Sequence, residues 1–165
     1  MTVKEKKGRI EGLKIAWIGD GNNVAHSWID AAQVLGFELT LACPPGYHPH
    51  PDVLAHAGKH IRVIEDPREA AEGADVINTD VWASMGQESQ RETRIGDFKG
   101  YQVNESLVSL GKPDVIVMHC LPAHRGEEIT TEVLEGQHSV VFDQAENKLH
   151  LHMALLEKMI LRKQA

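Results

Sequence analysis

An alternation of short apolar runs with stretches of helical spacing constrains the fold of this chain more than any other feature. The apolar runs lie at residues 13–19, 37–44, 61–66, 75–81 and 113–120, with a short final one at 139–144. Stretches of helical spacing lie at 23–36, 51–58, 67–74, 104–111, 130–136 and 145–163. Residues 82–100 are polar and carry no strand pattern. Strands separated by helices predict parallel pairing through right-handed crossovers.

The apolar runs are continuous, as in LKIAWIG at 13–19, and do not alternate with polar residues. Strands of this kind are buried on both faces of a sheet. The sequence therefore predicts an α/β fold. We expect a Rossmann-like, doubly wound, mainly parallel sheet of about five strands, with helices on both faces.

Composition and charge exclude several classes of protein. The 165 residues carry a net charge of -7, which argues against a general nucleic-acid-binding protein. Residues 1–12 lack the apolar centre of a signal peptide, and no apolar run approaches the roughly 18 residues of a membrane span. The two cysteines, Cys43 and Cys120, are far apart in the sequence and suit a reducing compartment. We expect a cytoplasmic protein that does not bind membranes.

Ligands of doubly wound folds bind beyond the carboxyl ends of the strands, which directs attention to the loops at 19–27, 43–51, 79–88 and 119–127. The first loop reads G-x-G-x-x-V, without the third glycine of a dinucleotide-binding motif. The second predicted strand also ends without the acidic residue that such a motif requires. Asn22 and Asn23 suit a helix cap, or a site for a carboxylate or phosphate at the helix start.

The other loops contain candidates for chemistry. Asp80 and Ser84 suit an ammonium ligand, or a turn and helix cap. Cys120 follows a strand and has His119, His124 and Arg125 as sequence neighbours. Positive groups can lower the pKa of a thiol toward neutrality, while burial makes a cysteine inert. A nucleophilic role needs an oriented base. The spacing of these histidines fits no usual zinc pattern.

Four segments in order resemble one known family: GDGNNVAHS (19–27), TDVWASMG (79–86), HCLP (119–122) and FDQAEN (142–147). Together they resemble the carboxyl-terminal, ornithine-binding domain of ornithine carbamoyltransferases, over essentially the whole chain. By this resemblance residues 1–12 are the remnant of an interdomain helix or linker. Residues 13–144 form the ornithine-binding α/β domain, and residues 145–165 form a terminal helix that packs back in the family.

The resemblance implies a role for each motif residue. Asn23 would bind the ornithine carboxylate with help from the Met85 backbone, and Asp80 and Ser84 would hold the α-ammonium group. Cys120 would orient the reacting amine, so that Cys120 and Asp80 are the candidate catalytic residues. In the family, the carbonyl of the residue that matches Leu121 contacts the carbamoyl group, and its bond to proline is cis. No cofactor or metal is implied.

The sequence departs from the family in two respects. The S-x-R-T-R-T and H-P-x-Q segments that hold carbamoyl phosphate are absent, so we expect half an enzyme that makes no citrulline alone. Lys148 stands where the family has an arginine that reaches carbamoyl phosphate, and a lysine lacks the bidentate fork. The full-length family enzyme is built on a homotrimer.

Two other interpretations stay open at this point. Related carbamoyltransferases act on aspartate, putrescine or acetylornithine, although the Asp80 and Ser84 pair favours a substrate with an α-amino group. The chain could also be a free-standing, non-catalytic amino-acid-binding or regulatory domain. A nucleotide-binding oxidoreductase domain is disfavoured by the missing glycine and acidic residue, and a titration with NADH tests it.

Overall fold

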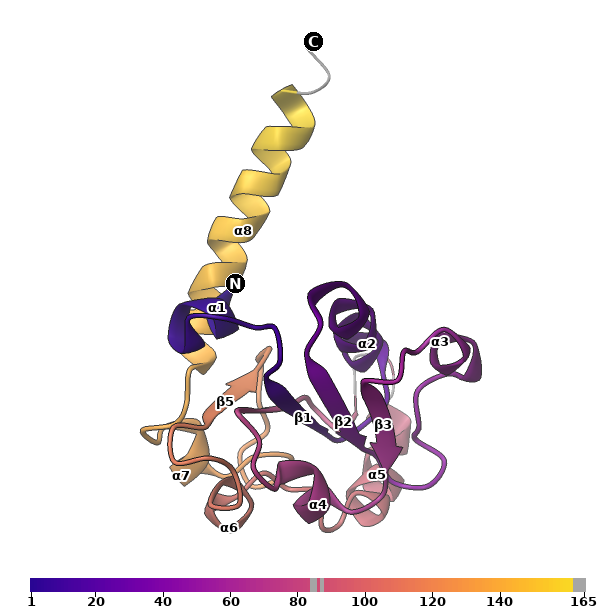
Figure 1. Ribbon diagram of the computed structural model, residues 1–165. Coiled ribbons are helices and arrows are strands. Elements are labelled where there is room, and N and C mark those ends of the chain that lie inside the picture. Colours follow the sequence, from indigo (N-terminus) through magenta and orange to yellow (C-terminus); the bar gives the residue numbers. More distant parts are fainter. Residues whose placement is uncertain (84–85, 87, 162–165) are drawn as a thin grey trace.

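The computed structural model describes residues 1–83, 86 and 88–161, and its elements alternate as predicted (Figure 1). The strands are β1 (Lys14–Ile18), β2 (Glu38–Ala42), β3 (Ile61–Ile64), β4 (Val76–Thr79) and β5 (Ile116–His119). The helices are α1 (Thr2–Lys7), α2 (Asn23–Leu35), α3 (Pro51–Ala55), α4 (Pro67–Ala71), η1 (Glu88–Gln90), α5 (Arg91–Asp97), α6 (Glu105–Val108), α7 (Thr131–Leu134) and α8 (Val141–Leu161).

The five strands form one sheet in the order β3-β2-β1-β4-β5, and every pair is parallel. This confirms the predicted fold class. The chain moves outward from β1 through β2 to β3 and then returns to place β4 on the other side of β1. The loops after β1 and β4 therefore diverge from adjacent strands, which opens a crevice at their carboxyl ends.

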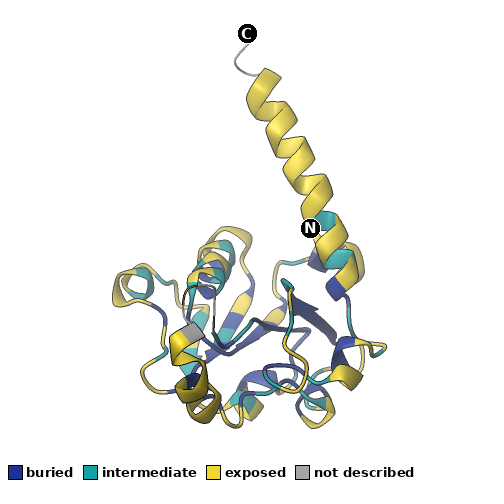
Figure 2. Cartoon of the chain, turned by 180° about the vertical axis from the view of Figure 1, so that it is seen from behind, coloured by how far each residue is buried: buried dark blue, intermediate teal, exposed yellow. Residues whose placement is uncertain are grey.

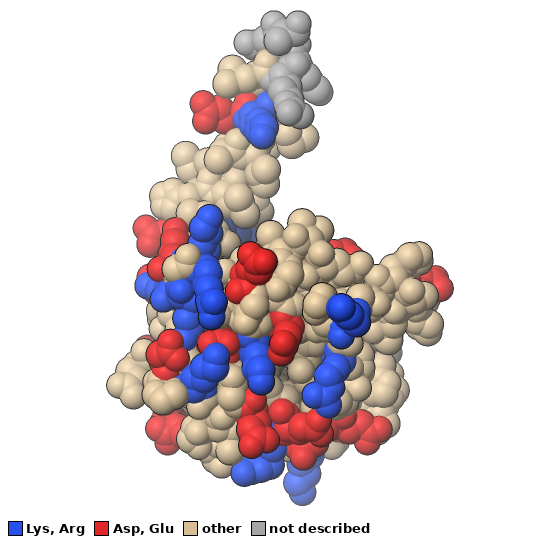
Figure 3. Space-filling view, in the orientation of Figure 1, with Lys and Arg blue, Asp and Glu red and all other residues tan. Residues whose placement is uncertain are grey.

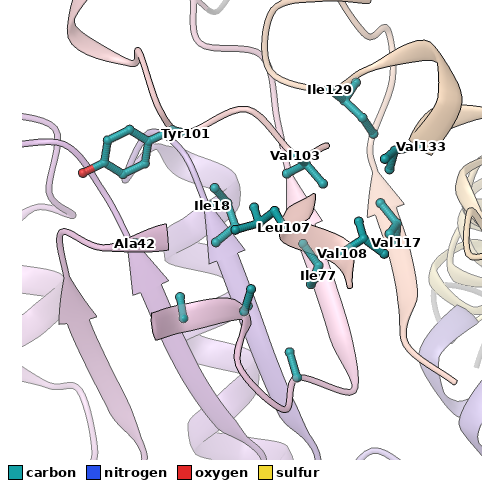
Figure 4. Packing of buried hydrophobic residues seen from close by; sticks show 14 of the residues in the cluster. Ile18, Ala42, Ile77, Tyr101, Val103, Leu107, Val108, Val117, Ile129 and Val133 are labelled. Carbon is teal, nitrogen blue, oxygen red and sulfur yellow. The ribbon is translucent and has the colours of Figure 1, made fainter. Parts of the chain in front are cut away.

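Neighbouring residues of a strand are buried on opposite faces of the sheet. Ile15 and Trp17 pack with Ala25 and Ile29 of α2 in one core. On the other face, Ile18, Ile77 and Val117 from β1, β4 and β5 pack with Leu107 and Val108 of α6 (Figure 4). Both faces are covered, which explains why the strands are continuous apolar runs.

The predicted strand at 139–144 is wrong. Ser139 makes only an isolated bridge to Val117, and α8 begins at Val141, four residues before the predicted start at 145. The Val140 N–H donates to the carbonyl of Val117 at 3.0 Å, and Val141 is fully buried. A short apolar run of this kind is compatible with a strand or a buried helix start, and the periodicity cannot distinguish them.

Helix α8 leaves the body of the domain after its first turns. Its first turns contact α1, where Asn147 donates to the Thr2 hydroxyl at 3.0 Å and Lys6 pairs with Asp143 at 2.6 Å. Beyond them the helix is exposed on its sides (Figure 2). Among the described residues, no helix is long and apolar enough to cross a membrane.

Candidate functional site

The crevice at the carboxyl ends of β1, β4 and β5 brings together Asn22, Asp80 and Cys120. Asp80 is 6% exposed, and its Oδ2 accepts from Asn22 Nδ2 at 3.1 Å. Its Oδ1 accepts from Cys120 Sγ at 3.0 Å and from the Val81 N–H at 2.8 Å. A buried carboxylate with donors on both oxygens is fixed in position, because each hydrogen bond removes a rotational freedom.

The local sequence explains how the first of these side chains reaches the crevice. Asn22 is the N-cap of α2, and its Oδ1 accepts from the Val24 and Ala25 N–H groups at 2.9 and 3.2 Å. The cap leaves Nδ2 of Asn22 free to donate to Asp80. The helix-cap interpretation is therefore confirmed for Asn22. Asn23 is the first residue of α2 and is exposed at its amino end.

Cys120 does not have the activated thiol that its positive sequence neighbours suggested. Burial, the hydrogen bond to Asp80 and the charge of Asp80 together raise the pKa of Cys120 to about 12. The Arg125 guanidinium pairs with Glu135 at 2.5 Å. Of the two alternatives that the sequence left open, the structure thus favours the buried, inert thiol. At neutral pH the thiol is protonated, and it acts as a hydrogen-bond donor rather than a nucleophile.

The side chain of His119, next to Cys120, makes hydrogen bonds inside the protein. His119 is fully buried, its Nε2 lies 3.1 Å from Glu128 Oε1, and its Nδ1 accepts from the Leu121 N–H at 2.9 Å. Because Nδ1 is an acceptor, the ring proton is on Nε2 and points to Glu128. The Glu128 oxygen also accepts from the His124 N–H at 2.6 Å. This pair fixes the backbone of the HCLP segment.

The backbone at Leu121 has the form that the family resemblance implied. The Leu121–Pro122 peptide bond is cis, and Leu121 has a φ of 56°. Leu121 also packs against the core on the α6 side of the sheet. The structure thus presents a distorted backbone next to the Cys120 thiol, at the edge of the crevice.

Lys148 of α8 reaches the same region. With Cys120, Val24, Ser27 and Leu151, it lines a cavity of about 370 Å³ between α1, α2 and α8. Its positive charge acts on Cys120 to lower the thiol pKa, against the larger effects of burial and Asp80. Ser84 and Met85 lie outside the described residues.

A second set of contacts was not predicted from the sequence. Arg94 of α5 is buried and pairs with Asp20 Oδ2 at 2.6 Å, and its guanidinium lies over the Tyr47 ring. Gln144 Oε1 accepts from the His119 N–H at 3.1 Å, which ties the first turn of α8 to the end of β5. Neither contact follows from local spacing, because each joins residues at least 25 positions apart.

Acidic and basic side chains are interspersed over the face of the molecule in Figure 3. The crevice itself combines a buried carboxylate, an amide, a neutral thiol and the amino end of a 13-residue helix. The carboxylate suits a cation, and the helix end suits an anion. This arrangement fits a small zwitterionic ligand such as an amino acid.

Comparison with known proteins identifies a matching family model and several relatives. Residues 11–159 match the family model described as aspartate/ornithine carbamoyltransferase, Asp/Orn binding domain. The chain is 58% identical over 164 residues to an ornithine carbamoyltransferase of Desulfotalea psychrophila, which covers 97% of this chain and 54% of that protein. An ornithine carbamoyltransferase of Geobacter metallireducens is 55% identical over 163 residues, which covers 96% of this chain and 54% of that protein.

A solved structure shares the fold. The ornithine carbamoyltransferase of Pyrococcus furiosus superposes with a TM-score of 0.88 at 49% identity, covering 94% of this chain and 52% of that one. The chain therefore spans about half the length of the relatives it matches. On the match of residues 11–159, the chain belongs to the family of aspartate/ornithine carbamoyltransferase Asp/Orn binding domains.

Proposed function

We propose that this chain is the ornithine-binding half of an ornithine carbamoyltransferase, which converts carbamoyl phosphate and L-ornithine into L-citrulline and phosphate. The observation that carries the proposal is the buried Asp80 carboxylate at the strand-order switch point, held by Asn22 and Cys120. The proposal is also supported by the relatives described above, which are named ornithine carbamoyltransferases.

Each charged group on the α-carbon of ornithine has a matching group in the crevice. Asp80, with Ser84, binds the α-ammonium group by charge and hydrogen bonding. Asn23 at the start of α2 binds the carboxylate, supported by the helix dipole and by the Met85 backbone. Putrescine lacks the α-carboxylate, and aspartate has a second carboxylate where ornithine has an amine. The site therefore favours ornithine over these alternatives.

Catalysis requires that the side-chain amine of ornithine is neutral and is directed at the carbamoyl group. A primary amine of this kind has a pKa near 10, and a closed pocket of low polarity favours its neutral form. Cys120, held by its hydrogen bond to Asp80, orients the amine, and the protonated thiol forms no covalent bond with the substrate. The Leu121 carbonyl contacts the carbamoyl group, and Lys148 attracts the phosphate. The rate gain comes from positioning and charge stabilisation.

The amino-terminal half of the enzyme, which holds carbamoyl phosphate, is a required partner in this proposal. Full activity then comes from a complete enzyme assembled as a homotrimer. Citrulline formation places the activity in arginine metabolism, including the urea cycle where that cycle operates. Free thiols at Cys43 and Cys120 support a cytoplasmic location.

The test is isothermal titration of the purified chain with L-ornithine, with putrescine and L-aspartate as matched ligands. We expect ornithine to bind most tightly and Asp80→Asn to raise its dissociation constant about 30-fold. Citrulline should form only after the amino-terminal half of a relative is added. Equal binding of putrescine would contradict the assignment of Asn23, because putrescine keeps two ammonium groups and lacks the carboxylate. Ornithine binding without citrulline in the complemented mixture would favour a non-catalytic binding domain.

A further inference from the structure

One buried guanidinium contacts three of the loops that border the crevice. Arg94 is 7% exposed, and its Nη1 donates to Asp20 Oδ2 at 2.6 Å and to the Trp82 carbonyl at 2.7 Å. Its guanidinium carbon lies 4.8 Å from the centre of the Tyr47 ring. Asp20 follows β1, Tyr47 follows β2 and Trp82 follows β4. The loops are thus joined through one side chain of α5.

Each of the two residues that accept a hydrogen bond from Arg94 is two positions from a side chain of the crevice. Asp20 precedes Asn22, and Trp82 follows Asp80. The carbonyl of Asp20 is also fixed by the Trp17 indole N–H at 2.9 Å, so the loop after β1 is held from both sides. A shift of either anchor would change the 3.1 Å hydrogen bond between Asn22 and Asp80.

Charge gives Arg94 a second effect on the crevice. Burial raises the pKa of Asp20, Arg94 opposes this by hydrogen bonding and charge, and the Asp80 carboxylate raises the pKa further. Asp20 and Asp80 therefore repel each other across the crevice. Arg94 neutralises Asp20, which leaves the charge of Asp80 available to a cationic ligand.

We propose that Arg94 is a positioning residue, which holds the loops after β1 and β4 so that Asn22, Asp80 and Cys120 keep their mutual geometry. Arg94 lies outside the four sequence motifs, and it lines a cavity together with Asn22 and Asn23. The identity of the ligand as ornithine rests on the proposed function, whereas the geometric role of Arg94 does not. Two readouts separate these two parts.

The experiment compares Arg94→Met and Arg94→Lys with the wild-type chain. The first readout is the dissociation constant for L-ornithine, by isothermal titration. The second is the rate at which iodoacetamide alkylates Cys120 without ligand, by peptide mass spectrometry, with thermal unfolding followed in parallel. The matched control is Arg62→Met, which breaks an exposed pair with Glu69 of the same 2.6 Å length.

We expect Arg94→Met to weaken ornithine binding at least tenfold and to alkylate Cys120 several times faster, because the thiol loses its fixed contact with Asp80. Arg94→Lys keeps the charge but not the planar fork, so it should fall between Met and wild type. If Arg94→Met does not fold, the Arg94→Lys variant alone still tests the positioning role. Arg62→Met should match wild type in both readouts.

Wild-type affinity and wild-type alkylation in both Arg94 variants would overturn the proposal. A lower unfolding temperature with unchanged affinity and unchanged alkylation would also overturn the proposal, because Arg94 would then contribute to stability alone. If the wild-type chain binds no ornithine but the Arg94 variants still alkylate faster, the positioning role stands and the ornithine assignment fails.

Discussion

The crevice at the strand ends and the outer part of α8 use their side chains in opposite ways. In the crevice, Asp80 and Glu128 are buried carboxylates, and each accepts at least two hydrogen bonds. Along α8, large apolar side chains are exposed. They are Phe142, Leu149, Leu151, Met153, Leu155, Leu156, Met159, Ile160 and Leu161.

This difference shows which part of the molecule stabilises itself. A buried charge costs several kcal/mol unless it is paired, so the hydrogen-bond network of the crevice must form for the body to fold. The outer residues of α8 gain little from the described part of the chain, because their apolar surface stays in water. Substitutions in the two regions should therefore differ by several kcal/mol, and the following predictions test that contrast.

The largest effect is expected from Glu128→Ala. It removes the acceptor of His119 Nε2 and of the His124 N–H and leaves a fully buried donor without a partner. The free energy of unfolding should fall by about 4 kcal/mol, measured by urea denaturation. Glu127→Ala is the control, because the Glu127 carboxylate pairs with the exposed Arg91, and it should cost under about 1 kcal/mol. Equal losses in both variants would contradict the network.

A slightly smaller loss is expected from Gly21→Ala at the crevice rim. An added Cβ would lie 2.3 Å from the Pro49 nitrogen, so backbone must move. We expect a loss of about 3 kcal/mol in urea denaturation, as for overpacking. Gly58→Ala is the matched control, since nothing lies within 4 Å of its Cβ. Similar stability of the two variants would show that the loop after β2 can move to accommodate the added methyl group at little cost in free energy.

An intermediate effect is expected on the Cys120 thiol. Its pKa is raised from 9.0 to about 12, partly by Asp80, so Asp80→Asn should lower that pKa and speed alkylation about tenfold at pH 9. The sign for stability follows: between about pH 9 and 12 only the unfolded thiol loses its proton, so stability falls as pH rises. Iodoacetamide kinetics across this window provide the measurement. Unchanged rates in Asp80→Asn would refute the coupling.

The smallest effect is expected on α8. Leu156→Lys exchanges a side chain that is 59% exposed, so the free energy of unfolding should change by under about 0.5 kcal/mol. Leu107→Lys, at the buried face of α6, is the comparison and should cost several kcal/mol. A loss of more than 2 kcal/mol in Leu156→Lys would show that the outer part of α8 is covered in solution.

The sequence alone determined the five strands of the sheet and the order of the site motifs. Continuous apolar runs predicted β1 to β5, because burial on both faces removes the need for alternation. The rule that ligands bind beyond parallel strand ends placed Asp80 and Cys120 in the crevice before their distance was known. The motif order also indicated the family that residues 11–159 match.

Only the tertiary structure decided how the crevice groups are paired. Sequence neighbours suggested positive charge around Cys120, but His119 turns to Glu128 and Arg125 to Glu135, while Asp80 reaches the thiol from another strand. The start of α8 at Val141 was likewise set by a bridge of the preceding residues to β5. The fold also brings Arg94 into contact with Asp20, which lies 74 positions away in the sequence. Local patterns record burial and periodicity, whereas the protonation of a thiol depends on charges that the fold brings to it.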